Sequence, residues 1–140
     1  MRVLVCVSVL AVLTGWLPAA RAEPVELELV LAVDSSASVD TDEFRLQMGG
    51  MASAFRDPAV LAEIAKGPHG AIAVTVFEWS SIGFQTVDVP WTRIATPADA
   101  EALARHLEAQ PRTVTTGATS ISGALQFAAT LFRDNAFQGI

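Results

Sequence analysis

The chain has 140 residues, enough for one domain and too few for two. Nine basic residues against fifteen acidic ones give a formal charge of −6, and such an acidic surface does not attract nucleic acid or anionic lipid electrostatically. The sequence holds no Gly-x-Ser-x-Gly, Gly-x-Gly-x-x-Gly or P-loop motif, so hydrolase and nucleotide chemistry are without support.

Residues 1–22 have the layout of a secretory signal peptide. A basic second residue precedes an almost wholly apolar run at residues 3–13, and Ala20-Arg21-Ala22 places small residues where signal peptidase cleaves. The run is shorter than the ~20 residues that span a bilayer, so an uncleaved membrane anchor is the weaker interpretation. Cleavage before Glu23 leaves seven basic and fifteen acidic residues, a formal charge of −8, and it removes Cys6, the single cysteine. The exported protein would therefore have no disulfide and no stable membrane insertion.

The first half of the remaining chain predicts a strand followed by two helices. Residues 27–33 alternate and then become continuously apolar, which is typical of a strand in the middle of a sheet covered on both faces. A helix begins after Asp40, with Glu43 placed to complete a capping box. A shorter helix at residues 59–65 follows Asp57-Pro58, a cap and a first-turn proline.

The second half predicts two strands and then two helices. Residues 71–79 form a strong strand, and the short turn after it makes residues 84–89 an antiparallel hairpin partner. Helices are expected from Thr96-Pro97 to about residue 109 and over residues 121–133. This order predicts an α/β fold, a doubly wound (Rossmann-like), mostly parallel sheet with one antiparallel hairpin strand and helices on both faces. Ligands bind such sheets at the carboxyl ends of the strands.

Oxygen-bearing side chains stand where the first strand ends. Asp34, Ser36 and Ser38 supply one carboxylate and two hydroxyls, hard donors that suit Mg²⁺, Mn²⁺ or Ca²⁺ better than zinc. A single carboxylate leaves a dication underneutralised, so the ion would keep water or accept an acidic ligand from outside. The same residues are also common in loops that cap helices, and Thr119 or Ser120 could simply cap the helix that follows them.

Two segments carry a resemblance to a known family. Asp34-Ser35-Ser36-Ala37-Ser38 resembles the metal-ion-dependent adhesion site of von Willebrand factor type A (vWA) domains, and residues 117–125, Gly-Ala-Thr-Ser-Ile-Ser-Gly-Ala-Leu, resemble its second segment. The chain from Glu23 to Ile140 resembles the front two-thirds of such a domain. Asp57-Pro58-Ala59-Val60 and Glu78-Trp79-Ser80 are similar to an exported bacterial group with a vWA fold, domain-of-unknown-function family 1194.

The resemblance implies a role for each matching residue. Ser36 and Ser38 would bind Mg²⁺ or Mn²⁺ directly, with Ca²⁺ as an alternative ion, and Asp34 and Thr119 would bind directly or through water. A carboxylate from a protein partner completes the octahedron in the family. The chain is therefore expected to be a periplasmic or extracellular binding module and not an enzyme. The alternatives are a structural subunit with a degenerate metal site and, less favoured, a hydrolase.

Departures from the family pattern define further expectations. The family often has Gly at the position of Ala37, and a positive φ there would cost on the order of 1 kcal/mol. The family's later metal-site Asp would lie beyond Ile140, so the C-terminal strands are expected to be missing and the first strand to lie at an exposed sheet edge. Glu78 is interpreted first as an exposed strand-end carboxylate. The alternative is that Glu78, like Ser120, supports the ligands without touching the ion.

Overall fold

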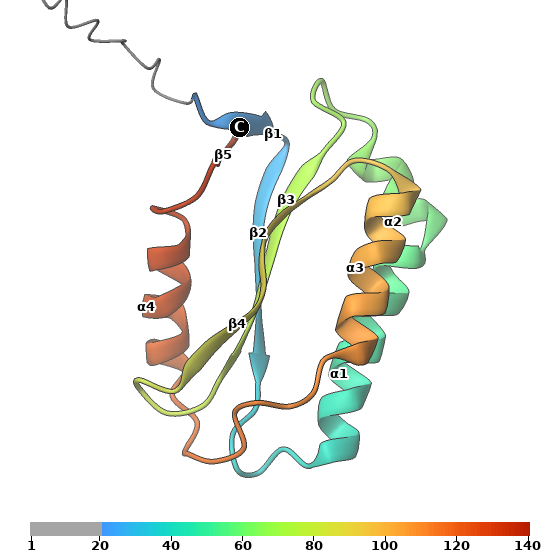
Figure 1. Cartoon of the computed structure of the whole chain (residues 1–140). Coiled ribbons are helices and arrows are strands. Elements are labelled where there is room, and N and C mark those ends of the chain that lie inside the picture. Colours follow the sequence, from blue (N-terminus) through green and yellow to red (C-terminus); the bar gives the residue numbers. More distant parts are fainter. Residues whose placement is uncertain (1–20) are drawn as a thin grey trace, which may run out of the picture.

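The computed structural model describes residues 21–140. All but two residues of the predicted signal peptide lie outside this range, so the prediction of a signal peptide concerns residues that are not described. Strands and helices follow one another in the order that the sequence predicts, with a short extra strand at either end of the described chain (Figure 1). In chain order the elements are β1 (Glu23–Val25), β2 (Leu27–Asp34), α1 (Thr41–Arg56), α2 (Pro58–Ile64), β3 (Ile72–Trp79), β4 (Gln85–Ile94), α3 (Pro97–Ala109), α4 (Ile121–Leu131) and β5 (Phe137–Gly139).

The main sheet has the strand order β2-β3-β4. β2 runs parallel to β3, with Asp34 opposite Trp79 at the end of the pair, and β3 and β4 are antiparallel, as the sequence predicts. All eight residues of β3 are buried, and six of them have apolar side chains, as is typical of a strand covered on both faces. Among residues 21–140, β2 is an edge strand of this sheet, mostly half-buried and with Leu27 49% exposed. This agrees with the exposed sheet edge that was expected for the first strand.

β4 is longer than predicted. The expected strand ended at Val89, whereas β4 continues through Pro90 to Ile94. The pairing with β3 shifts register between Val74 and Val76, and the hydroxyl of Thr75 donates a hydrogen bond to the carbonyl of Val89 at 2.7 Å. Such an irregularity on an edge strand accommodates a proline, which has no N–H to donate to the ladder.

The short strands β1 and β5 pair in parallel. Glu23 lies opposite Phe137 and Val25 opposite Gly139, and the N–H of Glu23 donates to the carbonyl of Ala136 at 2.7 Å. Val25 is fully buried against Ala71 and Ala73. The residues after α4 therefore return to the start of β2, an arrangement that the sequence did not reveal.

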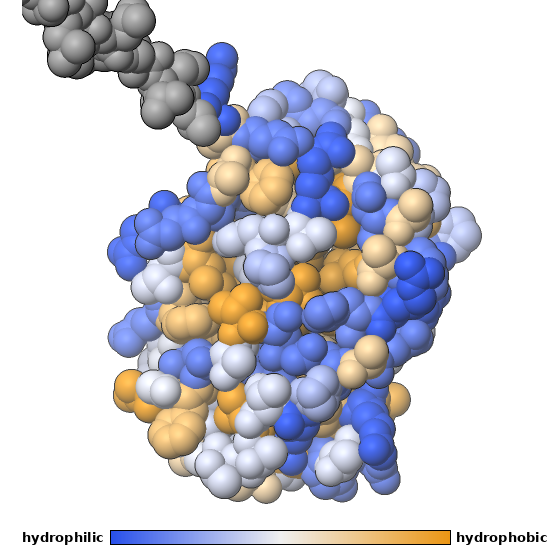
Figure 2. All heavy atoms as spheres, in the orientation of Figure 1, coloured by the Kyte–Doolittle hydropathy of each residue, from blue (hydrophilic) through white to orange (hydrophobic). Residues whose placement is uncertain are grey.

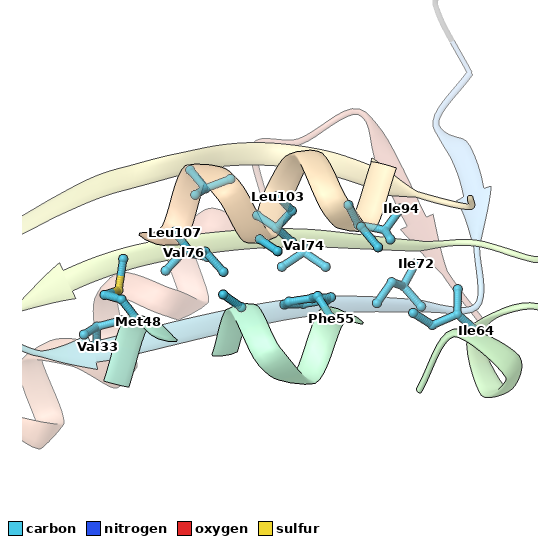
Figure 3. Packing of buried hydrophobic residues seen from close by; sticks show 14 of the residues in the cluster. Val33, Met48, Phe55, Ile64, Ile72, Val74, Val76, Ile94, Leu103 and Leu107 are labelled. Carbon is cyan, nitrogen blue, oxygen red and sulfur yellow. The ribbon is translucent and has the colours of Figure 1, made fainter. Parts of the chain in front are cut away.

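Helices cover both faces of the sheet, as predicted. α1, α2 and α3 pack against one face and α4 against the other (Figure 1). In the larger core, Leu103 and Leu107 of α3 point toward Val74 and Val76 of β3, with Phe55 of α1 below them (Figure 3). The smaller core lies under α4 and is built on Phe77 and Trp79.

The helix starts follow the predicted capping residues. Asp40 and Glu43 form a capping box at α1, and Thr96 and Asp99 form another at α3. Asp57 caps α2, in which Pro58 is the first residue.

Hydrophilic side chains dominate the surface over α1 to α3, whereas apolar residues reach the surface near the middle of the face that carries β4 (Figure 2). Within the part of the chain that the structure describes, no helix has the length and apolar character to cross a bilayer.

Candidate metal centre

The Asp34–Ser38 loop leaves the sheet at the carboxyl ends of two parallel strands. Asp34 is the last residue of β2, and the N–H of Ser35 donates to the carbonyl of Trp79 at 2.9 Å. The Oδ1 atom of Asp34 accepts the N–H of Ser36 at 2.8 Å, which orients both the carboxylate and the loop. The Nε2 atom of Gln47 on α1 donates to the backbone carbonyl of Asp34 at 3.0 Å, so α1 also fixes this turn.

The second predicted segment meets this loop. The N–H of Ala37 donates to the carbonyl of Gly117 at 3.0 Å, and the hydroxyl of Thr119 donates to Ser36 Oγ at 3.1 Å. The hydroxyl oxygens of Ser36 and Ser38 lie 3.3 Å apart. The structure thus brings together Ser36, Ser38 and Thr119 beside the Asp34 carboxylate, from segments more than eighty residues apart.

The spacing of these oxygens fits a small dication. Ligands about 2.1 Å from Mg²⁺ and at right angles to one another lie about 3.0 Å apart. The Ser36–Thr119 and Ser36–Ser38 separations of 3.1 and 3.3 Å are close to this value. Among residues 21–140 no group of three or more His, Cys, Asp or Glu residues could hold a metal ion, so an ion here would depend on hydroxyls and a single carboxylate.

Ala37, at the position where the vWA family often has Gly, is free of backbone strain. Within the described residues, only glycines have a positive φ, so Ala37 does not adopt the left-handed conformation that would have cost stability. The glycine requirement lies in the other segment. Gly117 has a φ of 108°, and a Cβ atom there would lie 2.6 Å from Ser80 Oγ.

Glu78 is not the exposed strand-end carboxylate that the sequence favoured. It is fully buried, and its Oε2 atom accepts hydrogen bonds from Ser35 Oγ at 2.9 Å, Thr113 N at 3.0 Å and Val114 N at 2.8 Å. Its Oε1 atom accepts the hydroxyl of Thr113 at 3.2 Å. Burial of a carboxylate is tolerated because donors surround it. Glu78 therefore holds the Asp34–Ser38 loop and the loop before Thr119 at the end of β3.

Ser120 caps α4, as the alternative interpretation of that loop predicted. Its hydroxyl accepts the N–H of Gly123 at 3.2 Å, and its own N–H donates to the carbonyl of Ser80 at 2.9 Å. The two adjacent residues therefore differ in role: the hydroxyl of Thr119 reaches Ser36, and that of Ser120 stabilises the helix.

Arg112 is a site residue that sequence reasoning missed. Its Nη2 atom donates to the carbonyls of Ser35 at 2.9 Å and Ser36 at 2.8 Å, and its Nε atom donates to Ser35 Oγ at 3.0 Å. One signal was available: Arg112 is the last charged residue before an uncharged stretch at residues 113–132.

Asp88 on β4 is a second acidic group in the electrostatic environment of Glu78. Burial raises the pKa of Asp88 to about 7, the negative charge of Glu78 adds to this rise, and a hydrogen bond from Gln110 opposes it. The Nε2 atom of Gln110 donates to Asp88 Oδ1 at 3.1 Å. Asp88 and Glu78 are therefore two acidic groups on neighbouring strands whose negative charges oppose one another.

Two solved structures of a pilus tip protein are similar to this chain. The vWF domain of the type V pili tip protein Mfa5 from Porphyromonas gingivalis is 14% identical, with 84% of this chain and 35% of that chain covered and a TM-score of 0.45. A structure of three N-terminal domains of Mfa5 is 16% identical, with 81% and 18% covered and a TM-score of 0.46. This chain spans about a third or less of the length of either. No curated protein matches the sequence.

A family model matches nearly all of the described chain. Residues 24–140 match the family described as "Protein of unknown function (DUF1194)", which confirms the family resemblance carried by Asp57–Val60 and Glu78–Ser80. The order of strands and helices is also the one that the vWA resemblance implied. The chain therefore belongs to the DUF1194 family.

Proposed function

We propose that this chain is a binding module that holds Mg²⁺ or Mn²⁺ and recognises an acidic group on a protein partner. The ion would be held by Asp34, Ser36, Ser38 and Thr119. The observation that carries the proposal is the meeting of three hydroxyl oxygens, 3.1 and 3.3 Å apart, beside a carboxylate at the carboxyl end of β2. Ala37 gives no support to the alternative of a degenerate site, because it introduces no backbone strain.

The charge of the site favours an acidic partner. Among the four proposed ligands, only Asp34 carries a negative charge. A bound dication would therefore retain a net positive charge. Ala37 and Ser38 are exposed, which leaves the outer side of the loop open to another molecule. When bound, the ion would supply a Lewis-acidic position for a carboxylate oxygen of the partner. The residues of the loop orient that position.

A binding role fits the surroundings of the serines better than hydrolysis does. The neighbours of Ser36 Oγ are the hydroxyls of Ser38 and Thr119. The ring of His106 instead lies 3.2 Å from the carbonyl of Asp88 on β4. A serine nucleophile needs a base within hydrogen-bond reach, and this arrangement offers Ser36 no imidazole. Export to the periplasm or the cell exterior is part of the proposal and rests on the signal-like residues 1–22.

The proposal is tested by titrating the full-length protein with Mn²⁺ and following the relaxation rate of water protons. We expect a bound ion with exchangeable waters, and we expect Asp34→Asn to abolish binding. Asp42→Asn is the matched control, because Asp42 is an exposed carboxylate in the first turn of α1. It should bind Mn²⁺ as the unaltered protein does.

A pair of synthetic peptides tests the acidic partner. A peptide with one Asp should displace water from bound Mn²⁺ and lower the relaxation enhancement, whereas the same peptide with Asn should not. Equal effects of the two peptides would contradict carboxylate recognition. Absence of Mn²⁺ binding at millimolar concentration would contradict the metal site itself.

A further inference from the structure

Arg112 joins the two segments of the candidate metal centre through the backbone. Its guanidinium donates to the carbonyls of Ser35 and Ser36 at 2.9 and 2.8 Å, and its Nε atom also donates to the carbonyl of Val114 at 3.1 Å. A planar guanidinium with several fixed donors suits such a multiple contact, and an ammonium group does not reproduce it. Arg112 therefore fixes the direction of two carbonyls in the loop that carries the proposed ligands.

Backbone carbonyls are the ligands that separate Ca²⁺ sites from Mg²⁺ sites. Ca²⁺ takes six to eight oxygens in a flexible shell and commonly includes main-chain carbonyls, whereas Mg²⁺ requires a compact octahedron. The carbonyl of Ser36 is already shared between Arg112 and the N–H of Val39, the latter at 3.0 Å. The carbonyl of Ser35 is also occupied by Arg112.

We infer that Arg112 is a positioning residue that sets ion selectivity. By binding the carbonyls of Ser35 and Ser36, it restricts the ion to side-chain oxygens and favours six-coordinate Mg²⁺ or Mn²⁺ over Ca²⁺. This inference rests on the proposed function, because it requires an ion at Asp34, Ser36, Ser38 and Thr119. It adds a residue that contacts the loop and not the ion.

The hydrogen-bond network explains how the positively charged guanidinium of Arg112 is accommodated beside the proposed ion site. Ser35 Oγ accepts from Arg112 Nε at 3.0 Å and lies 2.9 Å from Glu78 Oε2, so the buried carboxylate is linked to the guanidinium through one hydroxyl. The positive charge of Arg112 acts on any bound dication, whether Mg²⁺ or Ca²⁺. Its electrostatic effect therefore cancels in the ratio of the two dissociation constants, and that ratio isolates the effect on coordination.

The test compares Mg²⁺ and Ca²⁺ affinities by calorimetric titration of the full-length protein. Arg112→Gln and Arg112→Lys are compared with Arg105→Gln, which alters an arginine on α3 that is 67% exposed. We expect both Arg112 variants to shift the preference toward Ca²⁺ by on the order of tenfold, the scale seen when groups behind metal ligands are removed. Arg105→Gln should leave the preference unchanged.

The outcomes separate this inference from the proposed function. If the unaltered protein binds neither ion, the proposed function is wrong and the inference falls with it. If the protein binds ions and the Arg112 variants weaken Mg²⁺ and Ca²⁺ by equal factors, the selectivity role is wrong and the metal site stands. A shift of the preference further toward Mg²⁺ in the Arg112 variants would also overturn the inference.

A measurement on the unaltered protein keeps the inference testable even if the variants fail to fold. The carbonyl carbon resonances of Ser35 and Ser36 report direct ligation. They should stay nearly unchanged on addition of Mg²⁺, while resonances of the Ser36 and Ser38 side chains move. A large carbonyl shift would show that the ion displaces Arg112, and the inference would then be wrong.

Discussion

The hydroxyl of Ser35 donates a hydrogen bond to Oε2 of Glu78 across 2.9 Å, within a region closed to solvent. This contact links the loop that carries Asp34, Ser36 and Ser38 to the end of the central strand β3. Glu78 also accepts the backbone N–H groups of Thr113 and Val114, which lead toward Thr119. One buried carboxylate therefore sets the relative position of the two segments that carry the proposed ligands.

Glu78→Gln should destabilise the protein by about 2 to 4 kcal/mol. The amide group would direct its own N–H donors at the N–H groups of Thr113 or Val114, leaving buried donors without acceptors. Urea unfolding at neutral pH measures the loss. Glu63→Gln is the control, since Glu63 is an exposed carboxylate on α2 whose side chain is 69% accessible, and its effect should stay within ~0.5 kcal/mol. Equal stability of the two variants would contradict the role assigned to Glu78.

Gly117→Ala should impair the metal site, whereas Gly49→Ala should not. Gly117 has a φ of 108° and no room for a Cβ atom, which would lie 2.6 Å from Ser80 Oγ. Gly49 lies inside α1 with nothing within 4 Å of an added Cβ, so alanine there should stabilise the protein by about 0.5 to 1 kcal/mol. Thermal unfolding and Mn²⁺ titration of both variants measure the difference. An unchanged Mn²⁺ affinity in Gly117→Ala would argue against the placement of the second segment.

Asp88 should make the protein less stable as the pH rises from about 4 to about 7. The folded protein keeps the proton on Asp88 up to its raised pKa of about 7, while the unfolded chain loses it near the ordinary pKa of 3.8. The folded state therefore binds more protons in this window, and the free energy of unfolding falls across it. Asp88→Asn should remove that fall and gain on the order of 1 kcal/mol above pH 7, because solvent screens this half-buried group.

The measurement is the difference in urea-unfolding free energy between Asp88→Asn and the unaltered protein at pH 4, 5, 6 and 7. Subtraction cancels the titration of every other group that the two proteins share. The difference should grow with pH. A constant difference would show that Asp88 has an ordinary pKa.

Local sequence signals predicted most of the fold. Asp40-Glu43 and Asp57-Pro58 marked helix starts correctly because capping depends on residues within one turn. The extension of β4 past Pro90 escaped prediction because it depends on a register shift against β3, which only the paired strand reveals. The β1–β5 pair escaped for the same reason, since it joins residues more than a hundred positions apart.

The candidate site was predictable in its proposed ligands and not in its support. Asp34, Ser36, Ser38 and Thr119 lie in motifs that can be read along the chain. Glu78 looked exposed because it stands at the end of a strand, and its burial comes from a loop that folds over it about 35 residues later. Its position inside the wholly buried β3 was the one local hint.

The most direct test of the central claim is a thermal melt of the full-length protein with and without Mg²⁺ and Mn²⁺. An ion that binds only the folded state raises the midpoint, by an amount set by its concentration relative to the dissociation constant. We predict a rise with either ion that disappears in Asp34→Ala. The absence of a shift at millimolar ion, or an equal shift in Asp34→Ala, would contradict a metal centre at the carboxyl end of β2.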